Sequence, residues 1–310
     1  MTGKINKICV VGPGAIGCLF AAHLAEGGHN VFLLDKNHER AGLISRKGIT
    51  VERENKKRVV KVQAAANAEI IGVCDIVLIA VKSYDTESAV KHALPLSGKK
   101  SIFLTLQNGL GNEYKIASVV GKEKTIAGTT AHGANVLSSG SIIHAGIGDT
   151  YIGELSGRLT VRVKKIAEIF SSCKINTSPV TNINSRIWGK LVLNAGINPL
   201  TVLLNCRNGE LLNRPESKEL MRLLVEEAAA VAKKKKIRLP YPDAFAQTQK
   251  VAFLTGANIS SMLQDVRKGK KTEIDYINGA VVREGKNENS PTPFNQFATL
   301  LVKIAQDKKR

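Results

Sequence analysis

The sequence has few cysteines and few aromatic residues, and it lacks the residue spacings of metal and disulfide sites. Its five cysteines, among 310 residues, form no CxxC pair, and its six histidines are dispersed. We therefore expect no metal site, and the odd, scattered cysteines favour a reducing, cytoplasmic setting. Aromatic residues make up only 5% of the chain and glycines number 27. That balance suits an α/β protein with close-packed turns.

Long uninterrupted apolar runs and basic runs interleaved with aromatics are also missing; the longest basic run, KKKK at residues 233–236, closes a helical pattern and favours the negative end of a helix dipole. Residues 8–25 are largely apolar, but Gly12, Pro13, Gly14 and Gly17 interrupt them, so neither a signal peptide nor a membrane span is expected. The net charge is +19, yet the basic residues are scattered and not interleaved with aromatics. We therefore expect no nucleic-acid or membrane partner, but an attraction for small anions such as carboxylates and phosphates.

A glycine-rich turn near the amino terminus predicts a dinucleotide-binding unit. Residues 8–11 (ICVV) read as a buried strand, the turn fits G-x-G-x-x-G, and helical spacing follows it. Gly12 makes the tight turn, Gly14 lets the backbone approach a pyrophosphate, and Gly17 lets the helix pack against the strand. The pyrophosphate then meets the positive end of the helix. The predicted cofactor contacts here are Gly12, Pro13, Gly14, Ala15, Ile16 and Gly17.

The residues after the second predicted strand leave the choice of dinucleotide open. This strand, residues 31–34, ends at Asp35, 18 residues after Gly17. An acid at this position accepts a hydrogen bond from a ribose 2′-hydroxyl, which favours NADH. Lys36 beside it could instead meet the 2′-phosphate of NADPH, with Arg40 in reserve.

Two further apolar runs end in polar residues. The run over residues 74–85 carries Lys82 at its carboxyl end, and the run over residues 101–112 ends at Asn108. Because ligands bind at the carboxyl ends of parallel strands, Lys82 and Asn108 are predicted cofactor contacts. The alternating pattern of residues 141–155 predicts antiparallel edge strands.

After about residue 180 the strand-like runs give way to long helical periods. We therefore expect an α/β fold with a Rossmann-type domain over residues 1–180 and an all-helical domain over residues 181–310. The expected helices cover residues 188–198, 219–236, 244–261 and 272–286. The first should end or kink at Asn198, because Pro199 follows it, and Thr272 should cap the last.

Three polar residues recur along the otherwise apolar first helix of this half. Lys190, Asn194 and Asn198 lie four residues apart, so they stack on one helix face. A polar seam satisfied by neighbouring helices and a solvated face are the structural alternatives, since unpaired burial would be costly. We favour a face that lines a cleft, where a lysine polarises a ketone and delivers a proton as hydride arrives. The amides would hold a substrate carboxylate or hydroxyl.

Longer segments resemble the ketopantoate reductase (2-dehydropantoate 2-reductase) family. They occur in family order and span nearly the whole chain: GPGAIG, AVKSYD, LQNGLG, TTAHGA, WGKLVLNAGINPLTVLLNCRNGEL and NISSMLQDVRKGKKTEIDYING. The resemblance implies a Rossmann-type domain followed by a helical domain similar to that of 6-phosphogluconate dehydrogenase. It also implies NAD(P)H-dependent reduction of ketopantoate to pantoate, a step toward pantothenate and coenzyme A.

The resemblance also assigns roles to individual residues. It implies that Lys190 is the proton donor and that Glu273 lies near the lysine, the cofactor and the substrate. The implied substrate contacts, to which we add Asn108, are Asn194, Asn198, Asn208, Asn258 and Ser261. The implied cofactor contacts are the glycine turn, Lys82, Asn108, Ala134 and Glu273.

This chain departs from the family pattern at two places. Asp35-Lys36 stands where NADPH-using members typically have an arginine, so the family default of NADPH and the alternative of NADH both stay open. Lys270 stands where the family usually has an arginine, and a lysine only approximates a bidentate guanidinium. Reduction of another small 2-keto acid and a non-catalytic dinucleotide-sensing module are the alternative functions. A homodimer is also left open.

Overall fold

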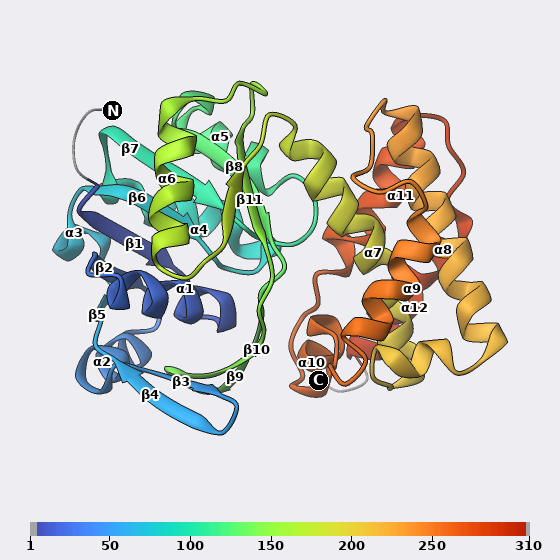
Figure 1. Cartoon of the computed structure of the whole chain (residues 1–310), viewed down its shortest axis with the longest axis horizontal. Coiled ribbons are helices and arrows are strands. Elements are labelled where there is room, and N and C mark those ends of the chain that lie inside the picture. The colour runs from blue at the N-terminus through green and yellow to red at the C-terminus, as the bar shows by residue number, and fades with distance from the viewer. Residues whose placement is uncertain (1–4, 308–310) are drawn as a thin grey trace. The chain divides into compact units, whose positions relative to one another are not determined.

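The chain forms two compact units in the computed structural model, which describes residues 5–307 (Figure 1). Unit 1 comprises residues 5–107 and 111–183, and unit 2 comprises residues 108–110 and 184–307. Unit 1 is an α/β structure built on a largely parallel sheet, and unit 2 is largely helical. The predicted fold class, a Rossmann-type part followed by a helical part, is thereby confirmed.

An eight-stranded sheet lies at the centre of unit 1, with strand order β12-β11-β8-β7-β6-β1-β2-β5. The six neighbouring strands β8, β7, β6, β1, β2 and β5 run parallel. Strand β11 is antiparallel to β8. Strand β1 lies between β2 and β6, so the strand order reverses direction there, which is where such sheets bind ligands. The strands are β1 (Lys7–Val11), β2 (Asn30–Leu34), β5 (Gln63–Ala65), β6 (Cys74–Ile79), β7 (Ser97–Thr105), β8 (Thr125–Thr130), β11 (Thr150–Glu154) and β12 (Thr177–Pro179).

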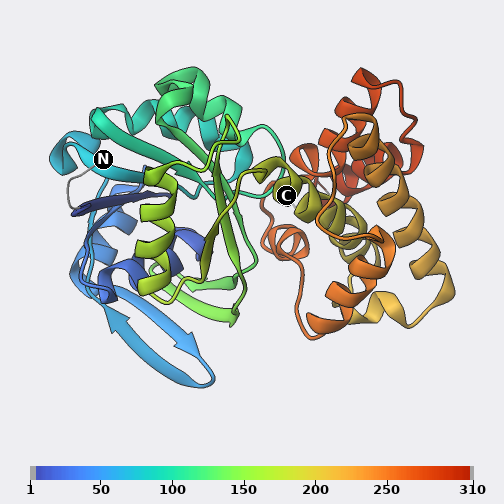
Figure 2. The same cartoon turned by 45° about the horizontal axis from the view of Figure 1, so that its top comes forward.

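Helices cover both faces of this sheet (Figure 1, Figure 2). Because successive side chains of a strand point to opposite faces, Ile8 and Val10 of β1 enter the core beneath α1 and α6. Cys9 and Val11 enter the core on the other face, with α3, α4 and α5. The helices are α1 (Ala15–Glu26), α2 (His38–Lys47), α3 (Ala68–Ile71), α4 (Thr86–His92), α5 (Asn112–Val120) and α6 (Val161–Ser172).

A second sheet of four strands, in the order β4-β3-β10-β9, packs against α1. Its strands are β3 (Ile49–Arg53), β4 (Lys56–Val60), β9 (Gly133–Ser138) and β10 (Ser141–Gly146). The antiparallel pairing predicted for residues 141–155 is confirmed, since β10 pairs with β9 and β11 with β8. The prediction that these strands form sheet edges is wrong, because β3 and β12 pair with their outer sides.

Three buried histidines lie where α1 packs on the small sheet. His144 of β10 lies 5.7 Å from His23 and 5.3 Å from His132, measured between ring centroids. Burial lowers the pKa of His23 and of His132 to about 4, and it lowers the pKa of His144 as well. Burial therefore disfavours the charged form of all three rings.

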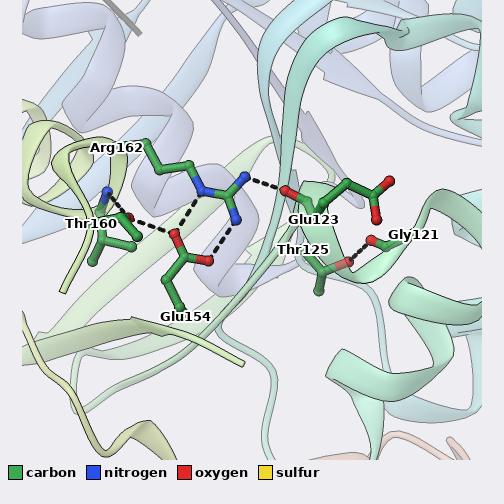
Figure 3. Close-up of polar contacts among 7 residues, drawn as sticks. Gly121, Glu123, Thr125, Glu154, Thr160 and Arg162 are labelled. Atoms are coloured by element: carbon green, nitrogen blue, oxygen red, sulfur yellow. Dashed lines mark hydrogen bonds and ion pairs between the residues drawn. The ribbon is translucent and has the colours of Figure 1, made fainter. Parts of the chain in front are cut away.

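An ion pair between the half-buried Arg162 and the buried Glu154 joins α6 to β11 (Figure 3). The Arg162 guanidinium donates to both carboxylate oxygens of Glu154, at 2.6 and 2.5 Å, and it also donates to the Glu123 carbonyl. The Thr160 hydroxyl donates to Glu154 at 2.6 Å. Although burial raises it, the pKa of Glu154 lies below its usual value because these donors favour the carboxylate. The pair fixes the start of α6 against the sheet.

Six helices and two short 3-10 helices form unit 2. They are α7 (Ile183–Leu204), η4 (Gly209–Leu212), α8 (Pro215–Lys234), α9 (Ala244–Leu254), α10 (Ser261–Arg267), η5 (Ile274–Tyr276), α11 (Asn278–Asn287) and α12 (Pro293–Asp307). The helix expected over residues 244–261 ends at Leu254, because Gly256 pairs with Gly209 and Ser260 caps the separate helix α10. The helix expected from Thr272 begins only at Asn278, because Thr272 hydrogen-bonds to Gln306. Helix α12 was not predicted.

Helix α7 is the core helix of unit 2. In the described part of the chain it is the one helix long and apolar enough to cross a membrane, by length and composition alone. However, 67% of its apolar window is buried inside the protein. Trp188, Leu191, Val192 and Ala195 lie in the hydrophobic core of unit 2. The apolar character of α7 therefore reflects its packing against the other helices.

Helix α7 continues through Pro199 to Leu204, so of the two expected outcomes at Asn198, an end or a kink, the end is wrong. A proline lacks the N–H that would bond to the carbonyl four residues earlier, here that of Ala195. The side-chain amide of Asn278 donates to this carbonyl at 3.0 Å, and it also donates to Asn295 Oδ1 at 3.0 Å. A side chain distant in sequence thus replaces the missing helical hydrogen bond.

Replacing Asn278 by alanine should lower the free energy of unfolding by about 3 kcal/mol, because it leaves two buried acceptors without their donor. Denaturant unfolding followed by circular dichroism measures this change. Asn287→Ala, at an exposed position of the same helix, is the matched control and should change the stability by less than about 0.5 kcal/mol. A loss below about 1 kcal/mol for Asn278→Ala would contradict this account of α7.

Candidate active site

The glycine turn between β1 and α1 is shaped by close backbone contacts. Gly12 has φ +98°, and its N–H donates to the Leu34 carbonyl at 2.9 Å. A Cβ at Gly17 would lie 2.0 Å from the Gly12 carbonyl oxygen, whereas a Cβ at Gly14 would meet only the Ala80 oxygen, at 3.9 Å. Gly12 and Gly17 are therefore required by the fold itself. Gly14 leaves open space above the turn.

This turn has the features that a dinucleotide diphosphate needs. Among the described residues, no side chain caps the amino terminus of α1, and its first turn holds no acidic residue. The backbone amides at that end lie beside the exposed Gly14. Of the other predicted contacts, Pro13 is buried, and Ala15 and Ile16 are half-buried, with Ile16 packed against the core. Bare amides at the positive end of a helix, next to an open glycine, fit an anionic diphosphate.

Asp35 follows β2 directly and is paired with Arg40. The carboxylate is 3% exposed, and it accepts from Arg40 Nη2 at 2.7 Å, from Arg40 Nε, and from the Asn37 N–H at 3.1 Å. Lys36 is largely exposed, with its Nζ 3.8 Å from a carboxylate oxygen of Asp85. Arg40 and Lys36 are the two cations that the sequence suggested as ligands of a 2′-phosphate. In the structure Arg40 lies beside the carboxylate of Asp35, and Lys36 lies beside that of Asp85.

The loops after β6 and β7 are tied together by polar side chains that sequence reasoning missed. Lys82 is half-buried and precedes the 3-10 helix η1 (Ser83–Asp85). The Gln107 side chain donates to the Val81 carbonyl at 2.7 Å and to Thr86 at 2.9 Å, and the Thr86 hydroxyl donates to Asn112 at 2.9 Å. The polar pair Gln107-Asn108, close to the end of a buried strand, was the feature of the sequence that could have indicated this hydrogen-bond network. These bonds hold the loop that carries Lys82.

Ala134 lies in β9 of the small sheet, four residues after the end of β8. It pairs with His144 of β10, and its side chain packs against the core beneath α1. Its predicted contact with a cofactor stays a prediction.

Lys190 lies on α7 in unit 2, where its environment changes the acidity of its amine. Burial lowers the pKa of Lys190 to about 8, while the charge of Glu273 raises it. The carboxylate of Glu273 is therefore close enough to stabilise the ammonium form. Neighbouring Gly189 is required by close packing, because a Cβ there would lie 2.7 Å from Pro240.

Glu273 is buried immediately before η5. Its carbonyl accepts from the Tyr276 N–H at 2.9 Å and from the Ile277 N–H at 3.1 Å. The Leu110 N–H donates to the Tyr276 carbonyl at 3.0 Å, which places residues 108–110 beside η5 and within unit 2. The structure thus brings the segment that carries Asn108 beside the short helix that Glu273 precedes.

The four asparagines of unit 2 that were predicted as substrate contacts form two groups. Asn194 is half-buried and Asn198 is buried, both on α7 with Lys190. Asn208 and Asn258 are joined to each other, since the Asn208 N–H donates to the Asn258 carbonyl at 3.0 Å. The Asn208 side-chain amide donates to Thr255 at 2.9 Å, while its buried Oδ1 has no partner within the described residues.

Ser261 is exposed at the start of α10, whereas its neighbour Ser260 is buried. The Ser260 side chain caps α10 and lies 2.6 Å from the Thr201 hydroxyl. Thr201 itself donates to the Asn198 carbonyl at 2.8 Å. Sequence reasoning missed Ser260 and Thr201. Together they connect the loop before α10 to α7 at Asn198. The serine pair Ser260-Ser261, just before a helical pattern, was the feature of the sequence that could have indicated this contact.

The chain is similar over nearly its whole length to proteins of one family. A family model described as "Ketopantoate reductase PanE/ApbA" matches residues 8–157, and "Ketopantoate reductase PanE/ApbA C terminal" matches residues 182–306. A 2-dehydropantoate 2-reductase of Archaeoglobus fulgidus is 33% identical, with 97% of this chain and 98% of that protein covered. One of Pyrococcus abyssi is 37% identical, with 96% of this chain and 97% of that protein covered.

Solved structures agree with this relationship. A 2-dehydropantoate 2-reductase from Geobacter metallireducens has a TM-score of 0.91 at 28% identity, covering 96% of this chain and 99% of that one. A ternary structure of D-mandelate dehydrogenase with NADH and anilino(oxo)acetate has a TM-score of 0.93 at 29% identity, covering 98% of this chain and 99% of that one. The chain belongs to the ketopantoate reductase PanE/ApbA family, a family of NAD(P)-dependent oxidoreductases.

Proposed function

We propose that this chain is a 2-dehydropantoate 2-reductase, which reduces the C2 ketone of ketopantoate to the alcohol of pantoate. The observation that carries the proposal is that α7 holds Lys190 within electrostatic reach of the buried acid Glu273, where burial lowers the pKa of the lysine to about 8. A lysine in this state is protonated at neutral pH and still able to release its proton. The full-length similarity to enzymes named for this reaction supports it.

The residues of each unit have separate tasks in this proposal. A reduced nicotinamide cofactor supplies the hydride when it is bound. The backbone amides around Gly14 bind its diphosphate. Lys190 donates the proton from Nζ to the carbonyl oxygen of the substrate and stabilises the negative charge that develops there. Asn194 and Asn198 orient the substrate through its carboxylate and hydroxyl, because amides form such bonds without adding charge.

The proposal also includes the boundaries of the two domains and the cellular compartment of the protein. We propose residues 1–180 as the cofactor domain and residues 181–310 as the substrate domain. The five cysteines are all unpaired, which supports a reducing compartment such as the cytoplasm.

The direct test is the oxidation of NADH and of NADPH in the presence of ketopantoate, with each cofactor titrated separately. We expect steady turnover with at least one of the two. A protein that binds a dinucleotide but never oxidises it with a 2-keto acid would instead be a sensing module, and the proposal would be wrong.

A reductase of another 2-keto acid is the second candidate. It is favoured by the similarity to D-mandelate dehydrogenase, which was solved with NADH and anilino(oxo)acetate. A substrate panel that compares ketopantoate with benzoylformate and branched aliphatic 2-keto acids separates the candidates. A higher kcat/KM for an aryl keto acid than for ketopantoate would select the second one.

Replacing Glu273 by glutamine should move the alkaline limb of the kcat/KM profile to lower pH. Lys190 is active when protonated, so the wild-type rate should fall as the pH rises through about 8. Removing the negative charge of Glu273 removes the influence that raises this pKa, so the limb should shift down by about one unit. Asp275→Asn, in η5 and paired with Lys303, is the control and should leave the limb in place. An unshifted limb in Glu273→Gln would mean that the carboxylate does not act on Lys190.

A further inference from the structure

The segment between α8 and α9, residues 235–243, packs against the first turns of α7. The Ser185 hydroxyl donates to the Arg238 carbonyl at 2.6 Å, and the Tyr241 hydroxyl donates to the Gly189 carbonyl at 2.8 Å. A Cβ at Gly189 would lie 2.7 Å from Pro240 and 3.5 Å from the Tyr241 ring. Since Ser185 and Gly189 are four residues apart, the segment is attached along one face of α7.

The polar residues of α7 lie on a different face from this contact. At about 3.6 residues per turn, Lys190, Asn194 and Asn198 form a line on roughly the opposite side of the helix from Gly189 and Gly196. A Cβ at Gly196 would lie 2.5 Å from a side chain of α8. Close packing against the two glycines therefore fixes the rotation of α7, and with it the direction in which the polar line points.

The Tyr241 hydrogen bond acts directly next to Lys190. The Gly189 carbonyl and the Lys190 N–H belong to one planar peptide unit, so Tyr241 holds the group that is bonded to the Lys190 Cα. In a helix this carbonyl also accepts from the N–H four residues later. Because a carbonyl oxygen has two lone pairs, the phenol supplies a second hydrogen bond without disturbing the helical one.

Tyr241 is itself held in one place. It lies between Pro240 and Pro242, which restrict the backbone on both sides. Its side chain is half-buried, and burial raises the pKa of Tyr241 above its usual value. The phenol therefore keeps its proton, and it can donate to the Gly189 carbonyl over the whole range of pH in which an enzyme of this kind works.

We propose that Tyr241 is a positioning residue for keto acid reduction, which acts through the Gly189 peptide unit to hold Lys190 at the substrate carbonyl. This inference rests on the proposed function and adds a residue to it. Proton transfer requires the donor and acceptor atoms to lie within hydrogen-bond reach, and small displacements of a reacting group strongly lower the rate. Loss of the phenol hydroxyl should therefore act on the chemical step and leave binding unchanged.

The first test is Tyr241→Phe, which keeps the ring and removes only the hydroxyl. We expect kcat for keto acid reduction to fall by about tenfold, while the KM of the keto acid and the dissociation constant of the cofactor change by less than about twofold. Tyr151→Phe is the matched control, because this half-buried tyrosine in unit 1 donates to Asp149 at 3.4 Å. It should turn over normally. Thermal unfolding checks that both variants keep the fold.

The second test repeats the substitution in the Lys190→Met background, with residual rates measured under single-turnover conditions. Without the amine there is nothing for Tyr241 to position, so Tyr241→Phe should lower the residual rate by less than about twofold. A role in the general stability of unit 2 would instead lower the rate by the same factor in both backgrounds. The double-mutant cycle therefore separates positioning of Lys190 from ordinary packing.

The outcomes distinguish this inference from the proposed function. An unchanged kcat in Tyr241→Phe, an equal loss in both backgrounds, or a loss confined to KM overturns the inference alone. A wild type that oxidises neither NADH nor NADPH with any 2-keto acid overturns the proposed function and this inference together.

Discussion

Replacing Lys190 by methionine is expected to lower kcat for keto acid reduction by about 10³-fold, while the dinucleotide still binds with unchanged affinity. Methionine keeps the length and apolar character of the lysine stem and removes only the amine. Because the amine supplies the proton and stabilises the developing alkoxide, its loss acts on the chemical step. Burial already lowers the pKa of Lys190 to about 8, so the protein should tolerate a neutral side chain there.

The measurement compares steady-state kcat with the cofactor dissociation constant for the same variant. Lys250→Met, at an exposed position of α9, carries the same chemical change and should turn over normally. Lys190→Arg should not restore the rate, since an arginine does not release a proton at neutral pH. Near-normal turnover by Lys190→Met would remove this residue from the proposed chemistry.

Alanine substitutions at Gly14 and Gly17 should give two different kinds of failure. A Cβ at Gly14 meets only one atom, at 3.9 Å, so Gly14→Ala should fold with the stability of the wild type. Its methyl group would occupy the space where a diphosphate approaches, and dinucleotide affinity should fall by about 100-fold or more. A Cβ at Gly17 would lie 2.0 Å from the Gly12 carbonyl oxygen. Gly17→Ala should therefore also lose about 3 kcal/mol of folding stability.

Thermal unfolding and cofactor titration of the two variants separate these effects. Wild-type affinity in Gly14→Ala would show that the diphosphate does not approach the backbone at that residue. A fully stable Gly17→Ala would show that α1 can move away from β1 without penalty, contrary to the packing described above.

The local parts of the cofactor half were predictable from sequence because short-range sterics determine them. The G-x-G-x-x-G turn needs glycine at Gly12, where φ is +98°, and at Gly17, where a Cβ would lie 2.0 Å from the Gly12 carbonyl oxygen. Strands β1 and β2 and helix α1 lie where their hydrophobic periods placed them. The helical character of the second half followed from its period in the same way. The roles predicted for the individual site residues stay predictions.

Other features depended on contacts between distant segments and could not be predicted. Helix α7 passes through Pro199 because Asn278, 83 positions away from Ala195, supplies the missing donor. Residues 108–110 join unit 2 through the Tyr276 carbonyl. The positions of β10 and β11 inside their sheets depended on β3 and β12, whose own patterns are short.

The sequence by itself determined the family, the dinucleotide turn and the order of an α/β part followed by a helical part. Periodicity and glycine sterics act within a few residues and determine the turn and the order of the two parts, whereas the family followed from the resemblance of the longer motifs. Only the tertiary structure decided that Arg40 is bound to Asp35 and that burial lowers the pKa of Lys190 to about 8. Charge pairing and burial depend on how distant segments pack together, and that packing sets the acidity and the availability of these side chains.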